Sequence, residues 1–276
     1  MSSLTLSLIQ ADLRWEDKDA NRRLLEEKID ALPQPAEVVV LPEMFSTGFS
    51  MRPEVLAETM DGPTLDWMKK VAARKKIILT GSLIIQEGGN YYNRLIWMLP
   101  NGQFGYYDKR HRFAYAGENE HYTAGNRRLV ASVKGWRVLL LVCYDLRFPV
   151  WSRQQPATPG TPVAGSPSSD VFSLEYDLII YVANWPERRS HAWKTLLQAR
   201  AIENQCYVAG VNRVGNDGNN IYHGGDSMIV DPLGEVLAHE SKEEALITHA
   251  LTKERLEEVR SRFPFWKDAD HFSIEP

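Results

Sequence analysis

Apolar positions follow strand-like and helix-like spacings in turn from the start of the chain. Residues 4–10 carry leucine at alternate positions, which is typical of a β-strand. Apolar residues then recur at helical spacing over 20–32, and Asp17 is placed to cap that helix. A buried strand at 37–41 and a helix that opens at 61–64 repeat the order. This alternation predicts an α/β fold.

The rest of the chain continues in the same manner. Further strands are predicted at 77–85, 91–99, 104–108, 138–142, 176–182, 206–211, 227–230, 236–238 and 245–250, and further helices at about 190–204 and 252–262. The five large aliphatic residues of 138–142 indicate a strand that is buried on both faces, as in a parallel sheet. We expect the strands at 236–238 and 245–250 to pair, and Gly224-Gly225-Asp226 to form a turn.

Two long segments lack a regular apolar pattern. Residues 110–131 form a predicted loop, and loops of that length in a compact domain are usually functional or disordered. Residues 154–170 are rich in Pro, Gly and Ser, and we interpret them as an exposed insertion. Because the strand pattern resumes directly afterwards, we expect a single domain over 1–276.

Length, charge and cysteine content narrow the class of protein. A chain of 276 residues with 43% hydrophobic residues can bury a substantial core. A net charge of −4 without a long basic run argues against nucleic acid as a partner, and the longest apolar runs are too short for a membrane span. The amino terminus lacks a basic leader, and Cys143 and Cys206 form no disulfide framework, so we expect a cytoplasmic protein.

Three reactive side chains each follow a predicted strand: Glu43, Lys109 and Cys143. Reactive groups collect at the carboxyl ends of strands in open α/β sheets. Attack of a thiol on a carbonyl needs a base, a positive charge or N–H donors for the oxyanion, and an acid for the leaving group. A carboxylate and a lysine supply these functions without histidine. Taken singly, each residue could instead be a buried small hydrophobe or a solvated loop end.

Each of the three lies in a distinctive segment, namely Leu41–Phe45, Tyr107–His111 and Val142–Pro149. These segments closely resemble the three signature segments of the nitrilase superfamily of carbon–nitrogen hydrolases, in the family's order. The resemblance covers essentially the whole chain and departs mainly at 154–170. It implies a four-layer αββα sandwich and a homodimer, with the segments after Cys143 and the aromatic carboxyl terminus as the expected contact regions.

The resemblance also implies roles for individual residues. Cys143 is the expected nucleophile, Glu43 the general base and acid, and Lys109 the cation that stabilises the tetrahedral oxyanion. The backbone N–H of Tyr144 would complete the oxyanion hole. This scheme needs no metal and no cofactor.

The family has a second glutamate in the loop after the lysine. Glu118 fits the family spacing better than Glu120, and its expected task is to hydrogen-bond Lys109 and hold it over the substrate. The histidines are scattered without a ligand spacing such as HExxH, so no metal site is predicted. A papain-like Cys–His pair is the weaker alternative.

The residues 44–49, 116–122 and 184–186 resemble the bacterial omega-amidase branch of the family. That branch hydrolyses the terminal amide of 2-oxoglutaramate to 2-oxoglutarate and ammonia. A substrate with a remote carboxylate needs a cation in its pocket. The candidates for substrate binding are Arg147, Arg188 and Arg189 as cations and Phe45, Tyr144 and Trp185 as pocket walls. Arg147 could instead pair with Asp145, and the aromatic residues could belong to the core.

Other substrates remain open at this stage. The same three residues would serve an N-carbamoyl compound, a peptide-like amide or a nitrile. A catalytically silent binding protein would have lost one of the three polar residues, and none is lost here.

Overall fold

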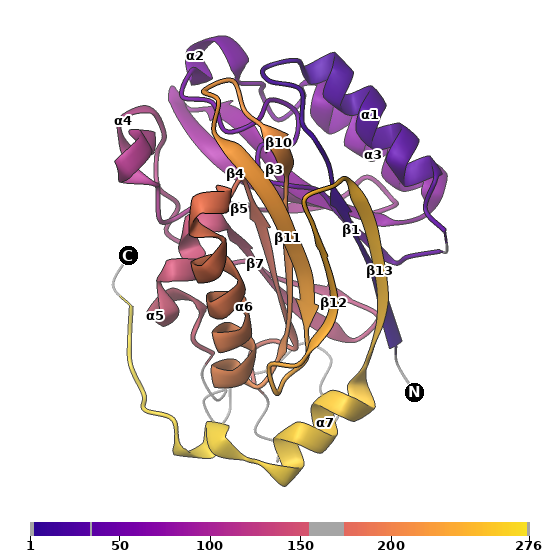
Figure 1. Cartoon of the computed structure of the whole chain (residues 1–276), viewed down its shortest axis with the longest axis vertical. Coiled ribbons are helices and arrows are strands. Elements are labelled where there is room, and N and C mark those ends of the chain that lie inside the picture. The colour runs from indigo at the N-terminus through magenta and orange to yellow at the C-terminus, as the bar shows by residue number, and fades with distance from the viewer. Residues whose placement is uncertain (1–2, 34, 155–173, 275–276) are drawn as a thin grey trace.

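The computed structural model describes residues 3–33, 35–154 and 174–274 (Figure 1). The predicted insertion at 154–170 therefore lies outside the described residues, except for Gln154. The strands are β1 (Ser3–Gln10), β2 (Val38–Val40), β3 (Ile78–Glu87), β4 (Asn90–Met98), β5 (Phe104–Asp108), β6 (Val130–Val133), β7 (Trp136–Val142), β8 (Leu178–Ala183), β9 (Tyr207–Asn212), β10 (Val214–Asn216), β11 (Tyr222–Val230), β12 (Val236–Ser241) and β13 (Ala245–Thr252).

The helices lie between the strands and at the carboxyl end. They are α1 (Lys18–Asp30), α2 (Pro53–Leu56), α3 (Pro63–Lys75), α4 (Glu118–His121), α5 (Pro149–Ser152), α6 (Ser190–Asn204) and α7 (Lys253–Arg262), with 3₁₀ turns η1 (Ala114–Ala116), η2 (Cys143–Arg147), η3 (Glu187–Arg189) and η4 (Phe265–Asp268). The side chain of Asp17 accepts a hydrogen bond from Ala20 N and caps α1 as predicted.

Two mixed sheets form the centre of the fold. The first has the strand order β13-β1-β2-β3-β4-β5, and the second has the order β10-β11-β9-β8-β7-β6 with β12 beside β11. Helices α1 and α3 cover the outer face of the first sheet, and α6 covers the outer face of the second (Figure 1). The α/β class and the four-layer αββα sandwich are therefore confirmed.

Alternation along β1 and β2 explains how the first sheet joins two cores. Leu6 and Leu8 belong to the cluster that the two sheets enclose, whereas Ile9 packs with the residues beneath α1 and α3. Val38 and Val39 divide between the two clusters in the same way. A strand that buries both faces can carry an unbroken apolar run, and β2 has that pattern, whereas β1 alternates leucine with small polar residues.

Strand β7 occupies a similar position in the second sheet. Every residue of Val138–Val142 is fully buried, and the strand runs parallel to β8. The predicted strand and its burial on both faces are thus confirmed. Because β7 ends inside the molecule, its packing also fixes the backbone position of Cys143, the residue that follows it.

Two predictions near the carboxyl end are wrong. Gly224, Gly225 and Asp226 lie within β11, where the pairing with β12 shifts register between Gly225 and Ser227, so they form a bulge and not a turn. Strands β12 and β13 do not pair with each other, because β12 pairs with β11 and β13 with β1. The connection between them therefore joins the two sheets.

The predicted loop 110–131 contains short ordered elements. It holds η1, α4 and the start of β6. Gly117 links η1 to α4 with a φ of 77°, a left-handed conformation that glycine adopts without strain. This turn points α4 back toward the end of β5, which brings Glu118 into the interior.

Candidate active site

The ends of three strands bring the candidate residues Glu43, Lys109 and Cys143 together. Glu43 follows β2 and Lys109 follows β5 in the first sheet, and Cys143 follows β7 in the second. Lys109 Nζ lies 2.9 Å from Glu43 Oε1, and both side chains are almost completely buried. Cys143 lies close enough to Glu43 for this carboxylate to act on the pKa of its thiol, and 9% of the cysteine remains exposed. A base, a cation and a thiol therefore meet at one point between the sheets.

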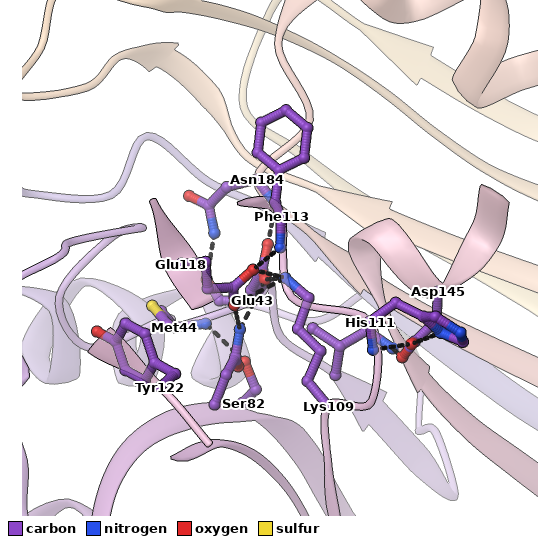
Figure 2. A network of polar contacts seen from close by, with 12 residues as sticks. Glu43, Met44, Ser82, Lys109, His111, Phe113, Glu118, Tyr122, Asp145 and Asn184 are labelled. Carbon is purple, nitrogen blue, oxygen red and sulfur yellow. Dashed lines mark hydrogen bonds and ion pairs between the residues drawn. The ribbon is translucent and has the colours of Figure 1, made fainter. Parts of the chain in front are cut away.

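Two of these strand ends turn through an unusual backbone conformation. Cys143 and Met44, the residue after Glu43, both have a φ of 43°. Residues other than glycine rarely adopt positive φ, at a cost of roughly 1–3 kcal/mol each. The Oγ of Ser82 accepts the Met44 N–H at 2.8 Å and holds one of the two turns (Figure 2). The surrounding structure thus holds Glu43 and Cys143 in tight turns directly after their strands.

A second carboxylate completes the charged cluster. Glu118 Oε1 and Oε2 lie 3.0 and 2.8 Å from Lys109 Nζ, so the ammonium sits between the carboxylates of Glu118 and Glu43 (Figure 2). Glu118 is fully buried, whereas Glu120 is exposed. The geometry therefore favours Glu118 over Glu120 as the second glutamate.

Two asparagines that the sequence analysis did not identify also contact this cluster. Asn93 Nδ2 donates to Glu43 Oε1 at 2.8 Å and to Glu118 Oε1 at 3.2 Å. The backbone N–H of Asn184 donates to Glu43 Oε2 at 2.8 Å. Glu43 Oε1 therefore accepts from Lys109 and Asn93, while Oε2 accepts from Asn184.

The electrostatics of the cluster follow from burial and from this excess of carboxylates. Burial opposes the charged ammonium of Lys109, but Glu118 and Glu43 outweigh it and raise the pKa of Lys109. Burial raises the pKa of Glu118, and repulsion by Glu43 adds to the effect against the attraction of Lys109. Burial and the negative charge of Glu43 raise the pKa of Cys143 well above its usual value. The resting cysteine is therefore a neutral thiol that needs a base.

Asp145 fixes the turn in which Cys143 lies. Its carboxylate accepts the backbone N–H of Val142 at 3.0 Å and the Tyr107 hydroxyl at 2.8 Å. It also accepts the backbone N–H of His111 at 3.0 Å, and its Oδ1 lies 2.8 Å from His111 Nδ1 (Figure 2). These contacts tie the start of η2 to the end of β5, next to Lys109. No spacing or motif in the sequence predicts this network.

A small pocket opens beside Cys143. Its volume is about 240 Å³, which suits a small molecule. Tyr144, Trp185 and Arg188 line it, as the sequence analysis expected for substrate-binding residues. The N–H of Tyr144 belongs to the first turn of η2, where backbone N–H groups have no partner within the helix.

Phe45 does not line the pocket: it is fully buried and packs on Trp67 beneath α3. The expectation that it forms a pocket wall is wrong, because the side chain points to the outer face of the first sheet.

Three guanidinium groups surround the pocket. Arg147 lies over the Trp185 ring at 4.9 Å, and Arg189 lies over the Phe113 ring at 5.1 Å. Burial lowers the pKa of Arg189, with repulsion from Arg188 and Arg147. Within the described residues, no ion pair joins any of the three arginines to a carboxylate, and Asp145 has other partners than Arg147. This rim therefore offers positive charge to an anion.

The alternative of a Cys–His pair receives no support from the geometry. The charged groups that act on the Cys143 thiol are Glu43, Lys109 and Glu118. His111 lies against Asp145 and stacks on Phe148.

In the part of the chain that the structure describes, no cluster of three potential ligands could hold a metal ion, and no helix is long and apolar enough to cross a membrane.

Comparison with known proteins defines the class. The family model described as carbon–nitrogen hydrolase matches residues 5–261. The chain therefore belongs to the carbon–nitrogen hydrolase family, as its resemblance to the nitrilase superfamily implied. It is a hydrolase that acts on carbon–nitrogen bonds of amides.

Individual relatives narrow this class. Omega-amidase YafV of Escherichia coli K12 is 42% identical over 275 residues, which cover 99% of this chain and all of the relative. The 2-oxoglutaramate amidase of Bacillus subtilis is 32% identical over 267 residues, or 96% of each chain. The crystal structure of a CN-hydrolase superfamily protein from Xanthomonas campestris, with an arsenic adduct in its active site, is similar over the whole of both chains, with a TM-score of 0.93 and 42% identity.

Proposed function

We propose that this amidase is an omega-amidase, which hydrolyses the terminal amide of 2-oxoglutaramate to 2-oxoglutarate and ammonia. The observation that carries the proposal is a thiol, Cys143, beside the Glu43–Lys109–Glu118 cluster, in a small pocket with a rim of arginines. The names of two full-length relatives support the same substrate class. A neutral amide at one end and a carboxylate at the other would match the two ends of the pocket.

The first half of the proposed reaction forms a thioester. The Cys143 proton moves to Glu43 while the sulfur attacks the amide carbon, and the carbonyl becomes an oxyanion. We assign the proton to Glu43 Oε2, because Oε1 already accepts from Lys109 and Asn93. The ammonium of Lys109 and the N–H of Tyr144 stabilise the oxyanion. Glu43 then returns its proton to the amide nitrogen, the C–N bond breaks, and ammonia leaves.

The second half hydrolyses the thioester. Glu43 removes a proton from water as the water oxygen attacks the carbonyl carbon, and the same donors hold the new oxyanion. The C–S bond breaks, the sulfur regains its proton from Glu43, and the acid product leaves. Glu118 keeps Lys109 charged and in place throughout, because it holds the ammonium through both carboxylate oxygens.

The arginine rim is the proposed anchor for the remote carboxylate. A guanidinium binds a carboxylate through two parallel hydrogen bonds, so one of Arg147, Arg188 and Arg189 suffices for one carboxylate. Arg147 and Arg188 are our first candidates. Trp185 would hold the carbon chain, because its ring lines the pocket beneath Arg147.

A panel of amides tests the proposal. Ammonia release is measured from 2-oxoglutaramate, succinamate, glutamine, an N-carbamoyl amino acid and a simple nitrile, with Cys143→Ala as the control. We expect strong turnover of the first two and none in the control. Preferred turnover of the carbamoyl compound or the nitrile would overturn the substrate assignment. Silence on all five, with Cys143 still open to alkylation, would do the same.

The assembly and location of the enzyme are part of the proposal. We propose a homodimer, because Val150 on α5, Ile202 on α6 and Phe265 on η4 expose apolar side chains in the regions that the family resemblance assigns to subunit contacts. We also propose a cytoplasmic location, since a thiol nucleophile must stay reduced. Light scattering of the purified chain tests the first statement, and a monomer at micromolar concentration would refute it.

A further inference from the structure

Asn93 contacts all three residues of the cluster, two of them at their charged groups. It lies on β4 and is 1% exposed. Its Nδ2 donates to Glu43 Oε1 at 2.8 Å and to Glu118 Oε1 at 3.2 Å, and its backbone carbonyl accepts the backbone N–H of Lys109 at 3.0 Å. The residue therefore links the two carboxylates through its side chain and the lysine through its backbone.

The charges of the cluster explain why a neutral donor is useful here. Two carboxylates share one ammonium, so the charge of each carboxylate is only partly compensated. A second cation in this position would remove the basicity that Glu43 needs in order to accept the thiol proton. An amide N–H donor supplies hydrogen bonds to both carboxylates without adding charge. We propose that Asn93 is a positioning residue whose amide donates to Glu43 and Glu118 and stabilises their negative charge, so that Glu43 is ready to receive the Cys143 proton. This inference rests on the roles proposed above for Glu43 and Cys143.

The unpaired oxygen of Asn93 supports this reading. Within the described residues, Asn93 Oδ1 is buried and has no hydrogen-bond partner. A buried acceptor without a partner is unfavourable. The opposite orientation of the amide would place Oδ1 against Glu43 Oε1 and Glu118 Oε1, so that three acceptor oxygens would face one another. In the observed orientation the amide N–H groups therefore donate to both carboxylates, while the amide oxygen accepts no hydrogen bond from the described residues.

The other titratable groups around the cluster do not compete for protons near neutral pH. Lys109 after β5, Tyr122 after α4 and Cys143 at the start of η2 all face it. Burial opposes the charge of Lys109, but the carboxylates raise its pKa; burial raises the pKa of Tyr122 and Cys143. Arg189 on η3 faces Cys143, and as an arginine it remains charged. His223 also lines the pocket beside Cys143, and burial lowers its pKa to about 4, whereas burial raises the pKa of Glu118.

The test compares Asn93→Val with Thr80→Val across the pH range. Valine fits a strand position, removes the amide donor and leaves little room for a replacing water. Thr80 is the matched control: it lies on β3 of the same sheet, its side chain is buried, and its Oγ1 has no partner among the described residues. The readouts are kcat/KM for a turned-over amide and the rate of Cys143 alkylation by iodoacetamide. The alkylation assay needs no substrate.

Plotted against pH, kcat/KM and the alkylation rate should each fall on the acidic side, which we call the acid limb. In Asn93→Val we expect both acid limbs to move up by about one pH unit, because the variant loses a hydrogen bond to a charged group. Thr80→Val should leave the limb in place. An Asn93→Val protein that folds, loses activity evenly at all pH values and keeps its acid limb would overturn the proposal, because a purely structural role predicts that result.

Asn93→Asp covers the case in which the valine variant does not fold. This substitution keeps the shape of the side chain and places a third carboxylate in the cluster, so we expect a larger upward shift of the acid limb. An unmoved limb would refute the proposed contacts. If the wild-type enzyme hydrolyses no amide in the panel, the proposed function fails, while the alkylation profile still decides the role of Asn93.

Discussion

Two buried charge clusters lie at opposite ends of the strands of the second sheet, and they have opposite compositions. At the amino ends of β7 and β8, Asp177 pairs with Arg137 at 3.2 Å, Lys253 at 2.7 Å and Arg260 at 3.1 Å. Burial opposes its charge, but these cations lower the pKa of Asp177 to about 2. At the carboxyl end of β7, two carboxylates share one lysine, and the pKa values of the groups around them are raised.

We interpret this difference as one between charges that stabilise the fold and charges that serve the proposed chemistry. The Asp177 cluster (Asp177, Arg137, Lys253 and Arg260) fastens α7 to the second sheet, and the lowered pKa corresponds to about 2 kcal/mol of stability at neutral pH. The cluster beside Cys143 holds an excess of negative charge in the interior, which makes it a good proton acceptor and a poor source of stability. Substitutions on each side should therefore separate activity from stability.

The largest expected effect is on activity alone. Cys143→Ala should lower kcat by at least about 10⁴-fold, since no other group replaces a lost nucleophile. The free energy of unfolding should change by less than about 1 kcal/mol, because the substitution removes one atom beside the pocket. Steady-state ammonia release and urea unfolding measure the two quantities. A variant with substantial turnover would refute the nucleophile assignment.

The next effect falls on activity and stability together. Lys109→Met leaves Glu43 and Glu118 buried without their cation, so the free energy of unfolding at pH 7 should fall by about 3–5 kcal/mol, and turnover should be lost. The loss of stability should shrink as the pH falls, because a proton on Glu118, whose pKa is raised, removes one of the uncompensated buried charges. Urea unfolding at pH 7 and at a lower pH measures this. The double variant Lys109→Met/Glu118→Gln should recover part of the loss, and equal stability of the two variants would contradict the shared ion pair.

A smaller effect, on stability alone, is expected at the other cluster. Asp177→Asn should lower the free energy of unfolding at pH 7 by about 2 kcal/mol and leave kcat unchanged. The sign of the pH dependence follows from the lowered pKa: between about pH 4 and pH 2 the unfolded chain binds more protons at this site, so the wild-type stability falls as the pH falls. The variant should lack this component. Thermal unfolding at several pH values tests it, and parallel curves for both proteins would count against it.

The smallest effect belongs to an exposed ion pair. On α3, Lys70 Nζ lies 2.6 Å from Asp66 Oδ2, and 75% and 55% of the two side chains are exposed. Lys70→Ala should change the free energy of unfolding by less than about 0.5 kcal/mol, because solvent and salt screen such pairs. A loss as large as that of Asp177→Asn would mean that burial does not explain the strength of the Asp177 cluster.

The sequence predicts the layers and the strand-end residues well, for one physical reason. A strand buried on both faces carries an unbroken apolar run, so the polar residue that ends it, such as Cys143 after β7, is visible directly. Asn93 is not visible in this way, because a polar residue inside an alternating strand has the same pattern whether it faces solvent or a buried carboxylate. Its partners come from three other segments of the chain.

The wrong predictions share a different cause. Gly224 and Gly225 are common turn residues, but in β11 they allow a bulge, and only the pairing with β12 distinguishes the two cases. The assignment of β12 and β13 to different sheets also depends on long-range pairing with β11 and β1. Phe45 shares a segment with Glu43, and only the folded backbone reveals that the two side chains point to opposite faces of the sheet.

The left-handed backbone of Cys143 also restricts how this enzyme can evolve. A positive φ is unfavourable for any side chain branched at Cβ. Position 44 is restricted in the same way, because Met44 also has a positive φ. Serine could replace the cysteine within the same turn, whereas threonine would meet a steric penalty before its chemistry mattered. The fold therefore admits serine as a hydroxyl nucleophile and disfavours threonine. Variants of this chain selected in the laboratory for folding alone should carry serine, alanine or glycine at position 143 far more readily than threonine or valine.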